Sequence, residues 1–357
     1  MNPSLIRATR GLYYLREVWN KVVHPASRRN EHARSEFYER LWRTAAEQIG
    51  ATFKAFGDGY FEIRLRGRRT LIWQGLVQVD DPVTLKLAGN KPMVHKLLAE
   101  KGIRVPRHAV FTVDALAAAK QFLYASGGAC VVKPAADTGA GDGVTTHVRT
   151  ESELHRAIAF ASIFSSTLMI EEQIRGDSYR LLYFDGTLLH ALHRKPPHVV
   201  GDGKSTVRQL IAAENNKRQH NAGSAAVTRL HLDPDCTATL RASGLSVHSV
   251  LPRGQEIAVK TVVNENSKED NLTVTSLIEE QLIREGALAA ETLGIRLAAV
   301  DVITSNPSLS LAEANGAVIE VNTTPGLHHH YNVANPELRD CIAAPILRTL
   351  LGETERG

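Results

Sequence analysis

Two acidic residues and an asparagine near the carboxyl end of the chain have the types and spacing of a metal site. Asp301 lies in the apolar run 297–303. Glu320 and Asn322 lie in the run 318–322, which continues into Thr-Thr-Pro-Gly. Each run predicts a β-strand that carries oxygen ligands at its buried end. Carboxylate and amide oxygens suit Mg²⁺, or Mn²⁺ in its place, with phosphate and water as the remaining ligands. The set therefore indicates nucleotide chemistry.

A lysine and a glycine-rich segment in the middle of the chain suit the binding of phosphate groups. Lys133 lies in the apolar run 130–134, and the segment 137–144 that follows contains three glycines. These are Gly139, Gly141 and Gly143. Glycines let backbone N–H groups approach phosphate oxygens closely, and a lysine adds a point charge. The spacing is neither that of a Walker A loop nor that of a dinucleotide fingerprint. Alone, such a loop is more often a simple turn.

Two further strand ends carry charged residues that could contact a nucleotide. The strand predicted at 168–172 leads through Glu171 and Glu172 to Ile174, where backbone groups could read the edge of adenine and one acid its amino group. Arg194 and the lysine after it follow another predicted strand and could hold a terminal phosphate or an acidic substrate. The simpler interpretations are an exposed acidic strand end and a solvated basic turn.

Three consecutive histidines, His328 to His330, invite a metal-site interpretation. Consecutive side chains cannot all face one ion from a regular strand or helix. We therefore expect substrate-side or loop roles for them.

The bulk composition is that of an ordinary soluble globular protein. The chain has 357 residues, 43% of them hydrophobic and 22% charged, and a net charge of +4. The charge is too mild to indicate nucleic acid as a partner. Three scattered cysteines form no CxxC pair, which favours neither a disulfide framework nor a zinc site and makes a reducing cytoplasm the default. No apolar run approaches the length of about 20 residues that a transmembrane helix needs.

Composition and periodicity divide the chain into parts. Residues 1–29 form a basic amphipathic extension, which could lie on an anionic membrane or carry a targeting address, although a helix docked on the main body or a loose extension is the favoured interpretation. Residues 30–89 predict a small N-terminal domain with a helix at 31–49 and a β-meander after it. From residue 90 helices and strands alternate. Capping boxes are predicted at Thr150 and Ser276.

Taken in order, these motifs resemble the ATP-grasp superfamily, and within it most of all the ATP-grasp module of cyanophycin synthetase. Glutathione synthetase and D-alanine–D-alanine ligase are more distant likenesses. The similar stretch runs from about Asn90 to Leu351. The motifs that carry it are Asn90-Lys91, the turn Gly-Ile-Arg-Val-Pro at 102–106, Val-Val-Lys-Pro at 131–134, the linker 171–174, Tyr-Arg-Leu-Leu at 179–182, Gly-Asp-Gly-Lys-Ser-Thr at 201–206, Asp301, and Glu-x-Asn-Thr-Thr-Pro-Gly at 320–326.

The resemblance implies an α+β chain with the ATP-grasp fold, in which two α+β lobes grip a nucleotide after a small N-terminal α/β domain. Residues 90–175 would form the N-lobe and its lid, and residues 176–357 the C-lobe with the metal site. Asp301, Glu320 and Asn322 would hold Mg²⁺. The implied nucleotide contacts are Lys91, Lys133, Gly139, Gly141, Gly143, Glu171, Glu172, Ile174, Asp177, Arg180 and Arg194. Of these, Lys133 and Arg194 would also act in catalysis.

The chain departs from the family at three places that bear on the substrate. Ser178 stands where the family usually has an acid for the ribose, and Asp177 lies one position earlier. The segment 264–271 replaces a loop rich in Ser-Thr-Gly-Gly that faces the substrate in the cyanophycin branch. Ala299 stands where D-alanine ligases carry an arginine, which argues against that reaction. The pair Glu313–Asn315 repeats the Glu-x-Asn spacing, but no Pro-Gly follows and a turn is expected there.

The implied activity is that of an ATP-dependent carboxylate–amine ligase, which forms a peptide or amide bond on an amino acid or small peptide through an acylphosphate. Arg180, or Lys260 together with Arg253, could hold an acidic substrate. A modifier of a protein or peptide tail and a non-catalytic nucleotide-binding regulator are the alternatives. Small carboxylates and amines are the expected partners. A cytoplasmic homodimer would fit the family.

Overall fold

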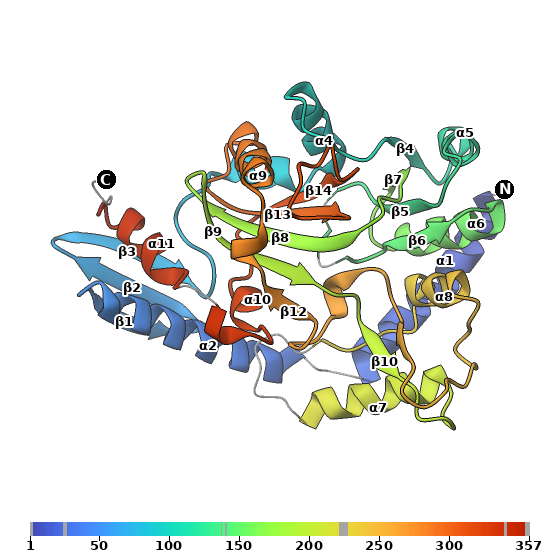
Figure 1. Ribbon diagram of the computed structural model, residues 1–357, viewed down its shortest axis with the longest axis horizontal. Helices are drawn as coiled ribbons and strands as arrows, with labels where there is room; N and C mark the ends of the chain where they lie inside the picture. The colour runs from blue at the N-terminus through green and yellow to red at the C-terminus, as the bar shows by residue number, and fades with distance from the viewer. Residues whose placement is uncertain are drawn as a thin grey trace.

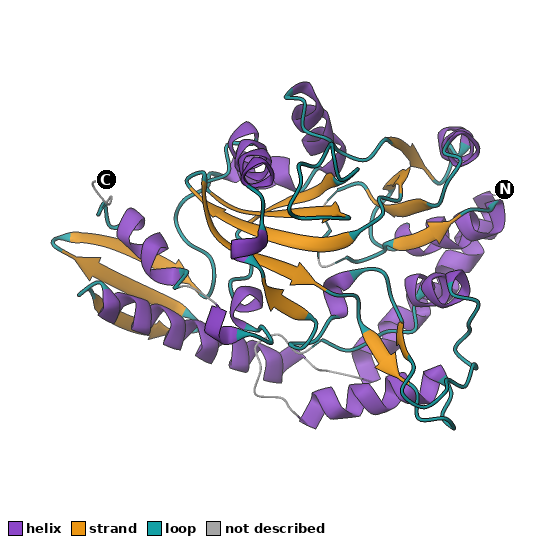
Figure 2. Cartoon of the chain, in the orientation of Figure 1, coloured by secondary structure: helices purple, strands orange, loops and turns teal. Residues whose placement is uncertain are grey.

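The structure, a computed structural model, describes residues 3–23, 27–136, 138–139, 141–220, 228–338 and 341–353. The side chains of residues 16–31 and 220 also lie outside the description. The predictions for 1–29 and for 137–144 therefore fall partly outside these ranges. Throughout the described part of the chain, the strands pair in antiparallel fashion and helices pack on the sheets in separate groups (Figure 1, Figure 2). This is the α+β class expected from the sequence.

A five-stranded sheet forms the middle of the molecule, in the order β12–β9–β8–β13–β14 (Figure 1). β8 and β9 are joined by a turn at Asp185 and Gly186, whose φ angles of 47° and 77° suit a type I′ hairpin. Helix α9 packs on this sheet, where Gly286 leaves room for the hydroxyl of Tyr183 at a point that a Cβ would occupy. The elements are β8 (Asp177–Phe184), β9 (Thr187–Arg194), β12 (Asn271–Thr273), β13 (Leu297–Thr304), β14 (Ala317–Thr323) and α9 (Glu280–Thr292).

A four-stranded sheet, β4–β7–β5–β6, forms a second lobe beside the central sheet. Helix α6 begins with the capping box predicted at Thr150 and Glu153 and packs on this sheet. Helix α4 begins at its predicted cap, where Asn90 Oδ1 accepts from the backbone N–H of Met93 over 3.1 Å. The elements of this lobe are β4 (His108–Thr112), α5 (Ala117–Ala125), β5 (Cys130–Pro134), β6 (Thr145–Val148), α6 (Glu151–Ala161), β7 (Thr167–Glu172) and, packed on α6, α1 (Pro3–Val23). Helix α4 (Lys91–Glu100) packs instead on the central sheet, where Val94 and Leu98 share a core with Val300 and Val321.

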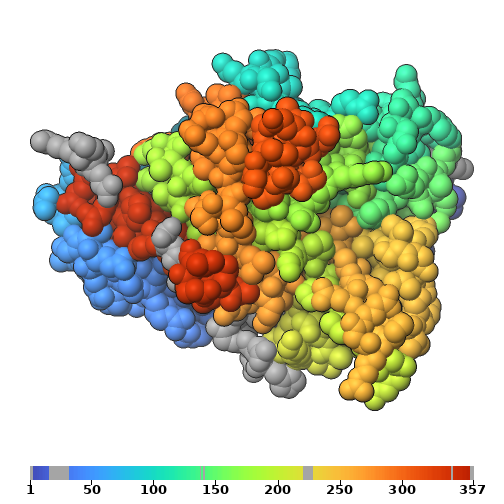
Figure 3. All heavy atoms as spheres, viewed as in Figure 1, coloured from blue at the N-terminus to red at the C-terminus, as the bar shows by residue number. Residues whose placement is uncertain are grey.

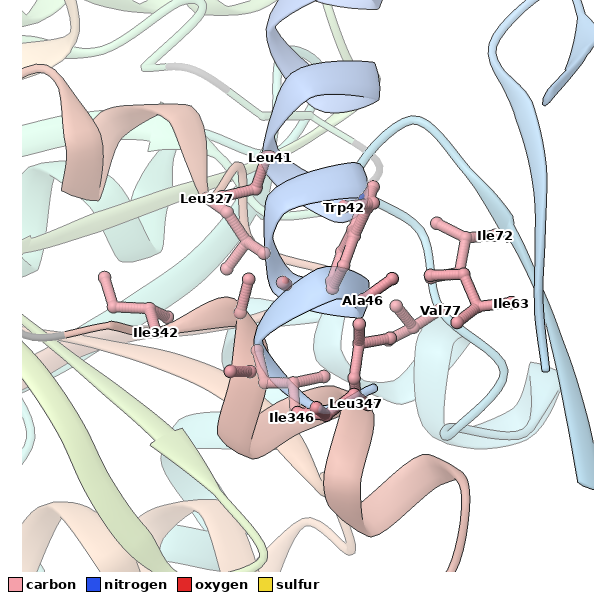
Figure 4. Close-up of a cluster of buried hydrophobic side chains, with 14 of the residues drawn as sticks. Leu41, Trp42, Ala46, Ile63, Ile72, Val77, Leu327, Ile342, Ile346 and Leu347 are labelled. Atoms are coloured by element: carbon pink, nitrogen blue, oxygen red, sulfur yellow. The ribbon is translucent and has the colours of Figure 1, made fainter. Parts of the chain in front are cut away.

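The N-terminal segment forms a third layer that is completed by the end of the chain. Trp42 and Ala46 of α2 pack with Ile63 of the β-meander on one side and with Ile346 of α11 on another (Figure 4). The space-filling view accordingly shows the blue N-terminal layer beside the red C-terminal residues (Figure 3). One core thus joins α2 and the β-meander to α11 near the end of the sequence. The elements of this layer are α2 (Ser27–Gln48), β1 (Thr52–Gly57), β2 (Tyr60–Leu65), β3 (Arg68–Trp73) and α11 (Ala343–Leu350). Helix α3 (Pro82–Ala88) follows this layer in sequence but packs with α4 and β14.

A smaller unit is inserted between β9 and β12 and has its own apolar core. Val207 and Ile211 of α7 pack there against Leu240 of α8 and Leu251. Its elements are β10 (His198–Val200), α7 (Val207–His220), α8 (Pro234–Ala242) and β11 (Glu256–Ala258). The remaining short elements are the 3₁₀ turns η1 (Val263–Glu265), η2 (Thr275–Leu277) and η3 (Pro336–Leu338) and the helix α10 (His328–Tyr331).

Two expectations about helix starts are corrected. The capping box predicted at Ser276 does not form, because Ser276 lies in η2 and Glu279 is itself the N-cap of α9, accepting from the N–H groups of Gln281 and Leu282. A carboxylate at the N-cap satisfies the same free N–H groups as the predicted box. The helix predicted at 31–49 begins earlier, at Ser27. No described helix has the length and apolar character needed to cross a bilayer.

The three consecutive histidines belong to the core rather than to a loop. They begin the short helix α10, where His328 and His330 are buried. The Tyr38 hydroxyl lies 2.9 Å from Nδ1 of His328, and Nδ1 of His330 lies 2.9 Å from Nδ1 of His190. Within the described ranges, no group of three or more His, Cys, Asp or Glu side chains could hold a metal ion. The loop role expected for them is wrong, because they lie in a helix, and the substrate-side role stays a prediction.

Substitution of the buried tryptophan tests whether the shared core stabilises the whole chain. Trp42 is fully buried and donates from Nε1 to the carbonyl of Gln74 over 2.7 Å, whereas Trp73 is 41% exposed. We expect Trp42→Ala to lower the free energy of unfolding by about 3–5 kcal/mol, because it leaves a cavity and an unpaired carbonyl. Trp73→Ala is the matched control and should cost clearly less. Urea denaturation of both variants gives the comparison, and equal losses would contradict a shared core.

The buried histidines predict a loss of stability in mild acid. Burial is the main cause that lowers the pKa of both His95 and His328 to about 3. Because these folded-state pKa values lie below the ordinary value near 6.5, the unfolded chain binds more protons, and stability falls as the pH falls below about 6.5. At pH 5 each histidine should cost about 2 kcal/mol. Urea denaturation between pH 7.5 and 5 measures the slope. A His328→Gln variant should show a shallower slope, and a flat wild-type profile would contradict the assignment.

Candidate active site

The three predicted oxygen ligands meet on neighbouring strands of the central sheet. Asp301 of β13 lies directly opposite Glu320 of β14, and Asn322 lies two positions further along the same strand face. The Asn322 Nδ2 donates to Asp301 Oδ2 over 3.0 Å and to Glu320 Oε2 over 3.4 Å. Strand pairing therefore brings together residues that are about twenty positions apart in the sequence. The cluster offers two carboxylates and one amide oxygen, which fits a hard divalent cation such as Mg²⁺.

Each carboxylate of this cluster has a basic partner. Arg180 lies opposite Asp301 across the β8–β13 pair and binds it in bidentate fashion, with Nε–Oδ1 at 2.7 Å and Nη2–Oδ2 at 2.6 Å. Lys91 Nζ lies 3.4 Å from Glu320 Oε1. Burial acts against the charge of Arg180, but the opposing charge of Asp301 outweighs it and raises the pKa of Arg180. The cations offset a repulsion that two adjacent carboxylates would otherwise feel.

Lys133 and Glu171 form a buried ion pair at the sheet of the second lobe. The Lys133 Nζ lies 2.7 Å from Glu171 Oε1, and the two side chains are 5% and 4% exposed. The Oε2 atom of Glu171 is buried without a hydrogen-bond partner in the described part of the protein. A buried carboxylate oxygen normally has a donor. An amino group such as that of adenine would supply one, so Glu171 suits the linker role predicted for it.

The other linker residues are placed differently. Glu172 accepts from the backbone N–H of Arg107 over 3.1 Å and from its Nε over 2.9 Å, so its carboxylate is tied to the segment after α4. Ile174 is half-buried in the connection between β7 and β8. Asp177 begins β8 with its side chain 60% exposed and lies 3.6 Å from His193 Nε2. Of the acids predicted near the adenine and ribose, Glu171 alone is deeply buried.

Arg194 is a buried cation with few compensating groups. It ends β9, is 6% exposed and donates from Nη2 to the carbonyl of Val263 over 3.0 Å. Burial, reinforced by the charge of Arg180, lowers the pKa of Arg194 to about 9. A guanidinium keeps its proton at neutral pH. The environment therefore favours the arrival of an anion beside it.

The glycine-rich segment packs against the C-lobe. Gly141 and Gly143 have φ angles of 73° and 74°, which glycine adopts without strain. A Cβ on Gly141 would lie 2.8 Å from Val262 Cγ1, while Gly139 has open space. Lys91 Nζ also reaches the carbonyl of Thr138 over 3.3 Å. The described residues of the segment thus lie close to Lys91, a candidate for phosphate binding, and to Val262 in the loop beside Arg194.

The structure shows a buried acid, Asp235, that the sequence did not assign to any site. Asp235 is buried and accepts from Thr146 of β6 and from the N–H groups of Thr261 and Val262. It ties the strand after the glycine segment to the loop beside Arg194. Its only sequence signal is its place in the first turn of α8, after the Asp-Pro that caps the helix. That signal predicts a helix start and says nothing of the long-range contacts.

One candidate for substrate binding is wrong. Lys260 is 2% exposed, and its Nζ lies 2.7 Å from both Asp233 Oδ2 and Glu265 Oε1. Burial acts against its charge, but the two carboxylates outweigh it and raise the pKa of Lys260 well above the usual value. The lysine is thus neutralised inside the protein. Arg180 is similarly bound to Asp301, and Arg253 is exposed.

No family model matches the chain. In sequence it is 30% identical over 270 residues to a cyanophycin synthetase of Geminocystis herdmanii, which covers 74% of this chain and 30% of the relative. It is 26% identical over 254 residues to a glutathione biosynthesis bifunctional protein of Clostridium perfringens, which covers 70% of this chain and 32% of the relative. The chain spans about a third of the length of these curated relatives.

The fold is also that of a solved ligase. The chain matches the crystal structure of a bifunctional glutathione synthetase from Pasteurella multocida with a TM-score of 0.55 and 19% identity, over 89% of this chain and 43% of that one. At this identity the match speaks for the fold alone. It agrees with the motifs and with the sequence relatives. The chain therefore has the ATP-grasp fold and is related in sequence to ATP-grasp ligases.

Proposed function

We propose that this protein is an ATP-dependent carboxylate–amine ligase that forms a peptide or amide bond through an acylphosphate. The observation that carries the proposal is the meeting of Asp301, Glu320 and Asn322 with the cations Arg180 and Lys91 at the sheet. This set suits a divalent cation and a polyphosphate together. Sequence relatives named as a cyanophycin synthetase and a glutathione biosynthesis bifunctional protein support ligation over a purely regulatory role or the modification of a protein tail.

The chemistry follows from the weak electrophilicity of a carboxylate, which an amine cannot attack at neutral pH. Transfer of the γ-phosphoryl group of ATP to the carboxylate gives an acylphosphate and ADP. Attack of the amine on the acyl carbon then releases phosphate. Positioning and charge neutralisation account for most of the catalysis. Mg²⁺ held by Asp301, Glu320 and Asn322 would supply neutralisation of the β- and γ-phosphate oxygens.

The basic residues divide the phosphate contacts among themselves. Lys133 and Lys91 would hold the α- and β-phosphates, and Lys91 would exchange its contacts with Glu320 and the Thr138 carbonyl for phosphate oxygens. Arg194 would hold the γ-phosphate and then the acylphosphate, for which its buried position is suited. Segment 137–144 would exclude water from the acylphosphate, with Gly139, Gly141 and Gly143 permitting close backbone approach.

The proposal extends to the substrates and the setting of the reaction. Amino acids or small peptides would supply the carboxylate and the amine. The departure at 264–271 from the cyanophycin branch favours a substrate other than that of the relatives. We place the reaction in the cytoplasm, and a homodimer is the oligomeric state to test first.

Neutralising one metal ligand should abolish turnover. We expect Glu320→Gln to reduce ADP formation by at least about a hundredfold with the fold intact, because it removes a charged ligand. Glu313→Gln is the matched control, since Glu313 has the same Glu-x-Asn spacing but accepts only from Ser310 in the contacts described for it. ADP release and mass spectrometry of new products are measured with ATP, Mg²⁺ and mixed amino-acid pools. Near-normal turnover in Glu320→Gln would remove the metal assignment, and ADP release independent of any added amine would contradict ligation.

Removing the buried ion pair should weaken nucleotide binding without a large loss of stability. Lys133→Met alone would leave Glu171 buried and unpaired, so the double variant Lys133→Met/Glu171→Gln is the informative one. Calorimetry with a non-hydrolysable ATP analogue should show at least about tenfold weaker binding than wild type in the presence of Mg²⁺. Wild-type binding should also weaken when EDTA replaces Mg²⁺. Equal affinities in all three titrations would contradict the site.

A further inference from the structure

Helix α1 docks on the second lobe through one of its faces. Ile6 is fully buried in the core formed with α6, and the Tyr13 ring contacts Phe160 edge-on with centroids 5.6 Å apart. Between them, the Thr9 hydroxyl lies 3.3 Å from His155 Nε2. Positions 6, 9 and 13 lie on one side of a helix. Figure 1 shows α1 beside α6 at the edge of the molecule, near the chain's N-terminus.

A second apolar stripe of α1 faces solvent. Leu5, Leu12 and Leu15 are 58%, 71% and 66% exposed, and Ala8 between them is exposed as well. Their spacing of three, four and three residues places them on one face of the helix, separate from the docked face. In sequence the same spacing continues to Trp19 and Val22 within α1. Exposed leucines in a contiguous row mark an interaction surface more often than scattered single ones do.

The charge of the helix indicates what this surface meets. The sequence of α1 has four basic residues, Arg7, Arg10, Arg16 and Lys21, and one acid, Glu17. Arg7 is paired with Asp114 of the second lobe, which leaves the helix with a net positive charge. Two copies of such a helix would bring like charges together, which opposes pairing through the leucine row. An anionic lipid surface is instead complementary to both features, since it takes up apolar side chains at the acyl boundary and attracts basic ones at the headgroups.

We propose that α1 attaches this protein to the surface of an anionic membrane, with Leu5, Leu12 and Leu15 entering the lipid and the basic side chains near the headgroups. The helix would lie on the bilayer while Ile6 and Tyr13 keep it joined to the second lobe. Binding therefore requires no rearrangement of the fold. The proposal does not depend on the ligase activity and can fail or succeed separately from it.

Vesicle sedimentation with the full chain tests the proposal. Wild-type protein should sediment with vesicles of phosphatidylcholine containing 30% phosphatidylserine, and bind at least about tenfold more weakly to pure phosphatidylcholine or in high salt. The double variant Leu12→Asp/Leu15→Asp should lose binding by at least about tenfold. The matched control Leu277→Asp/Leu338→Asp changes two leucines that are 59% and 60% exposed elsewhere, and it should bind as wild type does. Circular dichroism confirms that both variants are folded.

Three results would overturn the proposal. They are a wild-type protein that does not sediment with anionic vesicles, binding that the α1 variant retains, and binding that both double variants lose equally. Light scattering of the same samples tests whether a second copy of the chain covers the leucine row instead. A dimer that Leu12→Asp/Leu15→Asp dissociates, in a protein that ignores vesicles, would assign the leucine row to a second copy of the chain instead.

Discussion

The charge balance between Asp301 and Arg180 governs the arrangement of the candidate active site. Two carboxylates and an amide converge on neighbouring strands, and such a cluster is costly in a partly buried setting without compensating charge. Arg180 and Lys91 provide that charge within the described protein. A divalent cation would supply the same compensation and free both basic residues for phosphate. Under the proposed function, the binding of metal and nucleotide would change the partners of these side chains without rearranging the fold.

The surrounding loops hold this arrangement from several directions. Asp235 links β6 to the residues that follow Lys260, and Lys260 is itself fixed by Asp233 and Glu265. The loop so fixed carries the carbonyl of Val263 that accepts from Arg194. It also contacts Gly141 of the glycine segment. The inserted unit between β9 and β12 thus contributes rigidity at the point where the two lobes face each other, although none of its residues was expected to do so.

The N-terminal layer has a different relation to the site. Its core includes residues of α11 and also Leu182 and Leu297 of the central sheet. Tyr38 of this layer contacts His328, which follows closely after β14. The layer therefore packs on the face of the central sheet that carries Leu182 and Leu297. Segments that a domain boundary drawn from sequence would separate share one packed interior, because α11 packs back against α2.

The sequence by itself determined the local features of this protein. Apolar runs located β13, β14, β5 and β7, the caps at Asn90 and Thr150 located helix starts, and the residue types at Asp301, Glu320 and Asn322 indicated a hard cation. These features depend on neighbours within a few residues, which is why periodicity and side-chain chemistry could find them. The capping box predicted at Ser276 was nevertheless wrong, because Glu279 and not Ser276 is the N-cap of α9.

Only the tertiary structure decided which charges meet. The pairing of Arg180 with Asp301 depends on the register of β8 against β13, across more than a hundred residues. The burial of Lys260 and of His328 to His330 depends on elements distant in the chain. Burial and register arise from the packing of whole elements, and a charged or polar residue looks the same in sequence whether it faces solvent, a partner or the core.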